Sequence, residues 1–166
     1  KQVSAVGALN VTDGALVSVD PRNGDVVAYV GSAGPKVPGG DIDMAATPRQ
    51  MGSTFKLFTY STAFAEKRAT MISPVLDGPI SLADGAGQMY TPFDYDRRWH
   101  GVVPLEQALG NSLNIPAIRV ELAAGIPAIV SEARALGVTT LTNDPSTYGA
   151  SMTLGTYPIP LWEMAQ

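Results

Sequence analysis

A polar loop turns into an apolar helix at Arg49-Gln50-Met51-Gly52-Ser53-Thr54-Phe55-Lys56-Leu57-Phe58. Ser53 and Lys56 stand three residues apart at this junction, so on a helix their side chains share one face. The positive end of the helix dipole favours negative charge that develops near Ser53, and burial lowers the pKa of a lysine. Together the two residues can form an activated nucleophile without a histidine. The same spacing is also typical of a serine N-cap followed by an exposed lysine, so the rest of the chain must distinguish the two.

The composition is that of one folded domain. The chain has 166 residues, of which 45% are apolar and 16% charged, which suffices for one core and does not fit a disordered chain. The net charge of −4 and the eleven scattered Lys and Arg residues give no surface for nucleic acid. Without cysteine and with His100 as the single histidine, neither a zinc site nor a Ser-His triad is expected, although carboxylates could still hold a harder ion.

Membrane and export signals are not visible in the sequence. It has no run of about 18 apolar residues, which a membrane-spanning helix would need. Its first residues, Lys1-Gln2-Val3, lack the basic-then-apolar pattern of a signal peptide. If the parent protein is exported, its targeting segment lies outside this chain.

Residues 15–31 predict a β-hairpin. Two runs rich in β-branched residues flank Pro21-Arg22-Asn23-Gly24, which places proline at the first corner and Asn-Gly at the left-handed positions. Apolar residues alternate along each run, so each strand is expected to turn one face to a core. Since a two-stranded hairpin is not stable alone, it must join a larger sheet or pack on helices.

Helices are expected on both sides of a long connection. Residues 53–68 predict a central, buried helix, because they are apolar on more than one side. Residues 69–103 are rich in turn formers, including Asp84-Gly85-Ala86-Gly87, and predict a long connection without regular structure, a feature that is usually functional. Residues 104–137 predict three short helices that end at Gly137 and form a helical lobe.

A second polar motif, Ser112-Leu113-Asn114, lies in a break between two of these helices. A serine hydroxyl at this place could relay a proton between Lys56 and a leaving group, and an asparagine carboxamide could hold a substrate amide. Taken alone, the motif is more typical of a turn in which both side chains satisfy local backbone groups.

Ser-x-x-Lys followed by Ser-x-Asn resembles the motif set of penicillin-binding proteins and serine β-lactamases. Five further stretches resemble the bifunctional, class A branch of the penicillin-binding proteins, and they occur in the same order. They are the hairpin at 15–31, the approach to Ser53 from Met44, the loop Tyr90–Gly101, the segment Pro104–Ile118, and the pieces Met152–Gly155 and Trp162–Gln166. The resemblance implies an α/β (α+β) fold of the β-lactamase and transpeptidase type, with an antiparallel sheet and a helical lobe.

The resemblance also implies a role for each motif residue. Ser53 would be the acylated nucleophile, Lys56 the base that takes its proton, and Ser112 the shuttle that passes the proton toward the leaving D-alanine. Asn114 would bind the substrate's amide. The implied reaction is a D,D-transpeptidation that cross-links peptidoglycan stem peptides ending in D-Ala-D-Ala, and β-lactam antibiotics would acylate the same serine. No metal or organic cofactor is implied.

The implied parent protein is anchored in the bacterial cell membrane, with the transpeptidase domain on the extracytoplasmic face and a glycosyltransferase domain ahead of it. One functional motif of the family is missing, because no Lys-Thr-Gly or Lys-Ser-Gly triplet occurs in the chain. In the family this triplet lies on a strand beside the cleft, binds the substrate carboxylate and leads to the second oxyanion N–H. Its strand would follow Gln166, so residues 1–166 are expected to form a partial domain with weak or absent acylation.

Two alternatives stay open. A β-lactamase or D,D-carboxypeptidase would hand the acyl group to water and needs a base for that water, but the helix residues Glu106, Glu121 and Glu132 are expected to be structural. A catalytically silent sensor or interaction domain could also be built on the same fold.

The remaining polar and aromatic residues of the long connection have simpler expected roles. His100 is predicted to be a loop residue that bonds to the backbone. Trp99 and Tyr95 are predicted to pack, with a smaller chance of lining a peptide cleft. Asp94 and Asp96 are predicted to be solvated, because two loop carboxylates without further ligands rarely hold a metal.

Overall fold

The computed structural model describes residues 2–83 and 89–166, so the turn predicted at Asp84–Gly87 lies outside the described residues. The chain forms two compact units, one of Lys1–Gln50, Leu136–Thr140 and Pro158–Gln166 and one of Met51–Ala135 and Leu141–Tyr157. In the described residues the strands form four two-stranded antiparallel sheets. None of the helices described is both long enough and apolar enough to cross a lipid bilayer.

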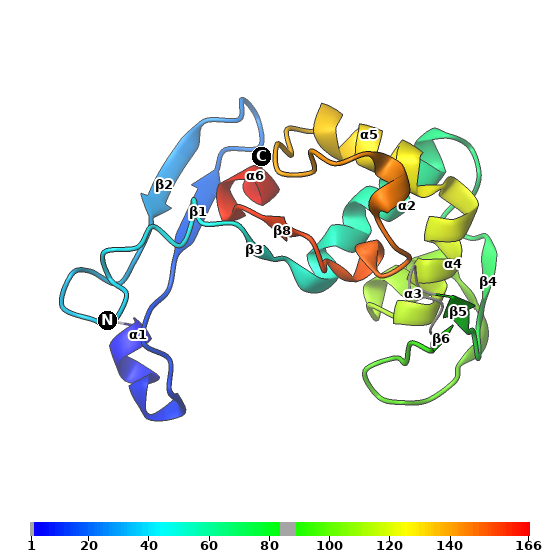
Figure 1. Ribbon diagram of the computed structural model, residues 1–166, viewed down its shortest axis with the longest axis horizontal. Helices are drawn as coiled ribbons and strands as arrows, with labels where there is room; N and C mark the ends of the chain where they lie inside the picture. Colours follow the sequence, from blue (N-terminus) through cyan, green and yellow to red (C-terminus); the bar gives the residue numbers. More distant parts are fainter. Residues whose placement is uncertain (1, 84–88) are drawn as a thin grey trace. The chain divides into compact units, whose positions relative to one another are not determined.

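The predicted hairpin is confirmed in the first unit by strands β1 (Leu16–Val19) and β2 (Val26–Val30), which pair antiparallel (Figure 1). Gly24 has a φ of +79° in the connecting turn, and its N–H donates to the carbonyl of Asp20 at 2.8 Å. Helix α6 (Leu161–Ala165) packs on β1, as expected for a hairpin that cannot stand alone. The prediction of a core-facing side is wrong for β2, whose five residues are all exposed, because β1 is its one partner among the described strands.

The rest of the first unit consists of short elements. They are α1 (Gln2–Ala5), η1 (Gly7–Leu9), and the pair β3 (Arg49–Gln50) and β8 (Pro158–Ile159). The buried carboxylate of Glu163 on α6 accepts the N–H of Thr139 at 3.0 Å and its hydroxyl at 2.6 Å. These two bonds hold the segment 136–140 on the unit.

The second unit is built around helix α2 (Lys56–Ala65), on which α4 (Asn114–Ala124) and α5 (Ile126–Ala135) pack. The prediction of a central helix buried on more than one side is confirmed, because Phe58, Tyr60 and Ala63 are all buried and point in different directions, although Leu57 is exposed. The helix begins as a 3-10 turn, η2 (Gly52–Phe55), and ends before the predicted Arg68, because the backbone of Lys67 is left-handed.

The connection 69–103 is more regular than predicted. Strand β4 (Pro74–Asp77) pairs with β7 (Gly101–Pro104), and β5 (Leu82–Ala83) pairs with β6 (Met89–Tyr90). These ladders are only two to four residues long, which is too short for an alternating apolar pattern to show in the sequence.

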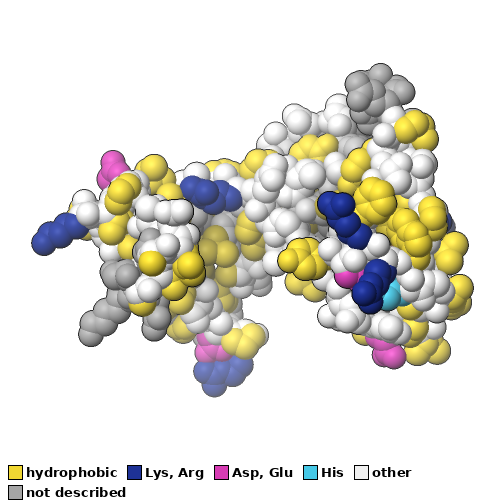
Figure 2. Space-filling model, turned by 90° about the horizontal axis from the view of Figure 1, so that it is seen from below, with side chains coloured by type: hydrophobic (Ala, Val, Ile, Leu, Met, Phe, Trp, Pro, Cys, Tyr) yellow, Lys and Arg dark blue, Asp and Glu magenta, His cyan; other side chains and the backbone are white. Residues whose placement is uncertain are grey.

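The helical lobe predicted at 104–137 is confirmed by α3 (Leu105–Gly110), α4 and α5. Gly137 has the positive φ, +100°, expected of a cap. Two further 3-10 turns follow in this unit, η3 (Pro145–Thr147) and η4 (Met152–Leu154). On the face drawn in Figure 2, the cationic side chains stand in separate groups.

Candidate active site

The Ser-x-x-Lys motif sits where the 3-10 turn η2 becomes helix α2. Gly52 has a φ of +57°, a left-handed conformation that glycine adopts without strain, and it turns the chain into η2. In a 3-10 turn the side chains at i and i+3 eclipse one another, which places Ser53 and Lys56 on one side. Ser53 is exposed, whereas Lys56 is 1% exposed. The motif therefore joins a hydroxyl at the surface to an ammonium group in the interior.

The ammonium group of Lys56 donates three hydrogen bonds to the second motif. Its Nζ lies 2.5 Å from the carbonyl oxygen of Ser112, 3.1 Å from Ser112 Oγ and 2.7 Å from Asn114 Oδ1. An ammonium group has three N–H donors, so these bonds satisfy the charged form of Lys56 completely. The structure thus brings Lys56, Ser112 and Asn114 together as predicted from the sequence, while the hydroxyl of Ser53 is not among the three acceptors.

The break between α3 and α4 presents Ser112 and Asn114 to this lysine. Ser112 has a φ of +54°, and strained backbone of this kind in a non-glycine residue is often found at functional sites. Asn114, the first residue of α4, donates from its carboxamide nitrogen to the carbonyl of Phe93 at 2.8 Å. Its carboxamide oxygen is therefore the atom that faces Lys56.

Burial lowers the pKa of Lys56 from 10.5 to about 8, and the negative charge of Asp94 acts in the opposite direction. We expect the methylene carbon next to Nζ to titrate near pH 8 in a ¹³C NMR experiment on protein with labelled lysine. A Lys56→Arg variant identifies the signal by its loss. A midpoint near 10.5 would contradict a desolvated lysine.

The turn η4 and Gly155 after it pack against the turn that carries Ser53, a role that no sequence motif indicated. A Cβ placed on Gly155 would lie 2.2 Å from the carbonyl oxygen of Gly52. Thr153 in η4 shares a buried hydrogen bond of 2.8 Å with Thr59, and its N–H donates to the carboxylate of Glu121 at 2.6 Å. The turn η4 is thus fixed to α2 and α4, and the residue after it touches the backbone that precedes Ser53.

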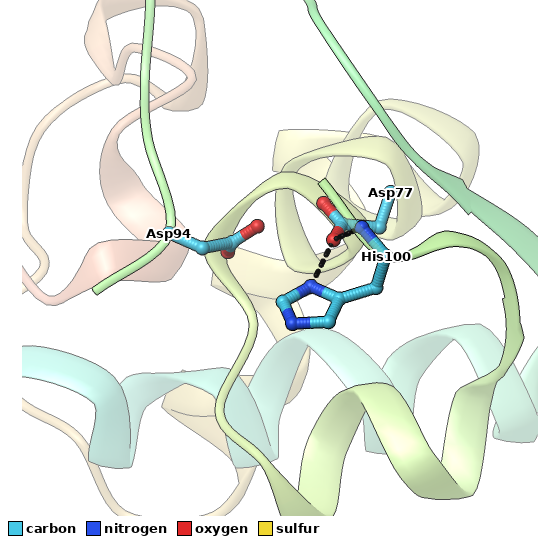
Figure 3. A group of neighbouring side chains, drawn as sticks. All are labelled: Asp77, Asp94 and His100. Atoms are coloured by element: carbon cyan, nitrogen blue, oxygen red, sulfur yellow. Dashed lines mark hydrogen bonds and ion pairs between the residues drawn. The ribbon is translucent and has the colours of Figure 1, made fainter. Parts of the chain in front are cut away.

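Three further titratable groups meet beside α4, as Figure 3 shows for Asp77, Asp94 and His100. The prediction that Asp94 is solvated is wrong, because it is 2% exposed and its Oδ1 accepts the N–H groups of Asn114 and Ile115. The prediction for His100 is also wrong, because its Nδ1 lies 2.5 Å from the buried carboxylate of Asp77. That contact raises the pKa of His100.

Asp77, Asp94 and His100 are also the described residues whose donor types could suit a divalent cation, with one donor from each within 4.8 Å of the others. In this arrangement, however, His100 and Asp77 Oδ2 are already bonded to one another, and Asp94 Oδ1 is bonded to α4. Both carboxylates are almost fully buried, so an ion would have to break these bonds to be held by all three residues. The group is better explained as a hydrogen-bonded charge network.

Among the neighbouring loop residues, the predictions are confirmed for Trp99 and Asp96 and wrong for Tyr95. Trp99 packs as expected, with its ring stacked on Phe93 at a centroid distance of 5.8 Å. Tyr95 is fully exposed, so its predicted packing is wrong, and it lines a surface hollow together with Ser112 and Asn111. Asp96 is exposed as predicted, and one of its oxygens lies 3.2 Å from His100 Nε2.

Comparison with known proteins places these features in a family. A family model described as the penicillin binding protein transpeptidase domain matches residues 14–152. The chain is 32% identical to penicillin-binding protein 1B of Vibrio cholerae over 93% of its own length, and 40% identical to penicillin-binding protein 1A of Neisseria gonorrhoeae over 68%. It spans only 19% and 14% of those two proteins.

Solved structures have the same fold over nearly the whole chain. The crystal structure of penicillin-binding protein 1A from Haemophilus influenzae matches 92% of this chain with a TM-score of 0.77 and 30% identity, and the match covers 22% of that chain. The structure of PonA1 from Mycobacterium tuberculosis in complex with penicillin V matches 98% of this chain with a TM-score of 0.75 and 23% identity, and covers 45% of that chain. These findings confirm the transpeptidase-type fold, of which this chain holds a part. Because the family model matches most of its length, the chain belongs to the penicillin-binding protein transpeptidase domain family and is homologous to the class A proteins 1A and 1B.

Proposed function

We propose that this chain carries the acylating part of a D,D-transpeptidase site. In the proposed reaction Ser53 Oγ attacks the carbonyl carbon between the two D-alanines of a peptidoglycan stem peptide, and neutral Lys56 takes the proton from Ser53. An ester forms to Ser53, the C–N bond to the terminal D-alanine breaks, and the leaving nitrogen receives the proton from Lys56 by way of Ser112. An amine of a second stem peptide then attacks the ester, forms the cross-link and restores the Ser53 hydroxyl.

The observation that carries this proposal is the buried ammonium group of Lys56 between Ser112 and Asn114. A pKa of about 8 leaves roughly a tenth of this lysine neutral at pH 7, and the neutral amine has a lone pair that can accept a proton. Its 3.1 Å contact with Ser112 Oγ gives the proton a second carrier. Asn114 can bind a substrate amide, and the N–H of Ser53 would supply one donor of the oxyanion hole, an interaction that is often worth about 3 kcal/mol.

We also propose the wider context that the family implies. Residues 1–166 would form part of a transpeptidase domain, and the strand with the Lys-Thr-Gly triplet would complete its sheet and its site. The exposed strand β2 supports this proposal, because among the described strands it pairs with β1 alone, so its other edge can take a further strand. The parent protein would be anchored in the bacterial membrane, carry a glycosyltransferase domain and act at the extracytoplasmic face on stem peptides, and β-lactams would acylate Ser53.

The test is covalent labelling of the 166-residue chain by a fluorescent penicillin, followed by mass spectrometry of the adduct. Without the second oxyanion donor, we expect slow labelling well below one molecule per chain, confined to Ser53 and lost in Ser53→Ala. Ser61→Ala is the matched control, since Ser61 lies on the same helix and donates only to the carbonyl of Phe58. Stoichiometric labelling would overturn the role given to the missing triplet, and an adduct that survives in Ser53→Ala would overturn the nucleophile.

One observation favours a catalytically silent domain as a second candidate. All three N–H donors of Lys56 are taken up by Ser112 and Asn114, and none is directed to Ser53. A complete lack of adduct in the parent protein that carries the Lys-Thr-Gly strand would support this candidate against the transpeptidase.

A further inference from the structure

The loop residue Asp94 reaches the start of helix α4 from a distant part of the sequence. Its Oδ1 accepts the backbone N–H groups of Asn114 and, at 3.3 Å, Ile115. The N-cap position of α4 itself is Leu113, whose side chain cannot accept a hydrogen bond. Asp94 therefore takes the place of an N-cap residue for α4, although it lies 20 residues before Asn114.

Two residues of the same loop bind Asn114, one through its side chain and one through its backbone. Phe93 binds its carboxamide nitrogen through a carbonyl group, and Asp94 binds its backbone N–H. The remaining polar atom of the side chain, Oδ1, accepts from Lys56 at 2.7 Å. Any movement of Asp94 is thus passed to the residue that binds the ammonium group.

Asp94 is also a charge close to that ammonium group. It raises the pKa of Lys56 against the larger effect of burial. The titratable groups around Asp94 are Lys56 and Tyr60 on α2, Asp77 on β4 and His100 ahead of β7. Burial and Asp77 raise the pKa of Asp94, whereas the two N–H groups of α4 lower it.

The two buried carboxylates differ in what stabilises their charge. Asp77 has the ring of His100 beside it, at 2.5 Å, whereas Asp94 accepts the N–H groups of Asn114 and Ile115. Hydrogen bonds to a buried carboxylate favour its charged form. The start of α4 therefore favours the ionised form of Asp94, which opposes the effect of burial on the pKa of Lys56.

We propose that Asp94 is a positioning residue of the site: its carboxylate fixes Asn114 against Lys56 and opposes release of the Lys56 proton. The proposal rests on the assignment of Lys56 as the base. Asp94 would set the pH at which the base becomes available, and a substitution that keeps the hydrogen bonds but removes the charge would shift that pH downward.

The test follows the Lys56 titration by ¹³C NMR in Asp94→Asn, whose carboxamide oxygen can still accept from Asn114 and Ile115. We expect the midpoint to fall by about one pH unit, because a nearby opposite charge is lost. Glu106→Gln, which removes an exposed carboxylate on α3, is the matched control and is expected to leave the midpoint unchanged. Asp94→Ala should also displace the Asn114 amide signals, which Asp94→Asn should preserve.

The coupling between two charges is reciprocal, so a second measurement does not depend on the Asp94 variants. In Lys56→Met the carboxyl carbon of Asp94 should titrate at a higher pH than in the unsubstituted chain. An unchanged Lys56 midpoint in Asp94→Asn, or an unchanged Asp94 titration in Lys56→Met, would overturn the proposal. Both measurements are made without penicillin, so failure of acylation and failure of this proposal give different results.

Discussion

Gly155→Ala is expected to lower the free energy of unfolding by about 2–5 kcal/mol. The added Cβ would lie 2.2 Å from the carbonyl oxygen and 2.3 Å from the nitrogen of Gly52, both of which are backbone atoms that cannot rotate away. Gly155 also has a φ of +72°, where an L-residue is strained by about 1–2 kcal/mol. The two glycines therefore form a backbone contact that no other residue pair could make.

Two control substitutions separate the clash from the strain. Gly101 has nearly the same φ, +73°, but no atom within 4 Å of an added Cβ, so Gly101→Ala should show the strain alone. Gly149 has an ordinary φ and open space, so Gly149→Ala should be close to neutral. Urea unfolding followed by circular dichroism gives the three free energies. Equal losses for Gly155→Ala and Gly101→Ala would show that the close contact with Gly52 does not matter.

The same contact connects stability to the site. Gly52 is the residue before Ser53, and its left-handed φ starts the turn that carries Ser53 and Lys56. To admit a methyl group at Gly155, this turn has to move away from η4, and Ser53 moves with it. We therefore expect Gly155→Ala to lose any penicillin adduct on Ser53 even at low temperature, where the chain is still folded.

Only those residues of the site that belong to a recognisable sequence motif could be predicted from the sequence. Lys56, Ser112 and Asn114 were predicted as one site because Ser-x-x-Lys followed by Ser-x-Asn resembles the motif set of a known family, and the structure places them within hydrogen-bond distance. Asp94 and His100 were misjudged, because their partners, the start of α4 and Asp77 on β4, are distant in the sequence, which does not show which segments meet. Gly155 was named only as the last residue of the piece Met152–Gly155, since a close backbone approach leaves no side chain as a signal.

In the fold, too, the features that depend on neighbouring residues were predicted, and those that depend on distant segments were not. The hairpin turn at Pro21–Gly24 and the helices of the lobe depend on residues within a few positions of one another, and both predictions are confirmed. The ladder between β4 and β7 depends on segments about 25 residues apart and so escaped prediction. The exposure of β2 was missed for a similar reason. Alternation of apolar residues predicts that a strand can bury one face, but it does not predict whether another part of the described chain covers that face.

The free energy of unfolding of Glu121→Gln, minus that of the unsubstituted chain, is expected to be about 2 kcal/mol higher at pH 8 than at pH 5. Glu121 is fully buried on α4, and burial raises its pKa from 4.5 to about 7 against the opposing hydrogen bond from Thr153. Between these two values the folded chain keeps a proton that the unfolded chain has lost, so stability falls as the pH rises through this window. Glutamine has no such proton, and its carboxamide oxygen can still accept the N–H of Thr153.

The measurement is the free energy of unfolding in urea at pH 5 and at pH 8 for both chains, because the difference between them cancels the titration of Lys56, Asp94 and His100. Glu132→Gln is the control, since Glu132 on α5 is partly exposed and its substitution should give the same difference at both pH values. A pH-independent difference for Glu121→Gln would mean that Glu121 is ionised in the folded chain throughout. In that case the 2.6 Å bond from Thr153 would itself be strong enough to hold a buried charge, and it would hold η4 against the backbone of Gly52 equally firmly at pH 5 and at pH 8.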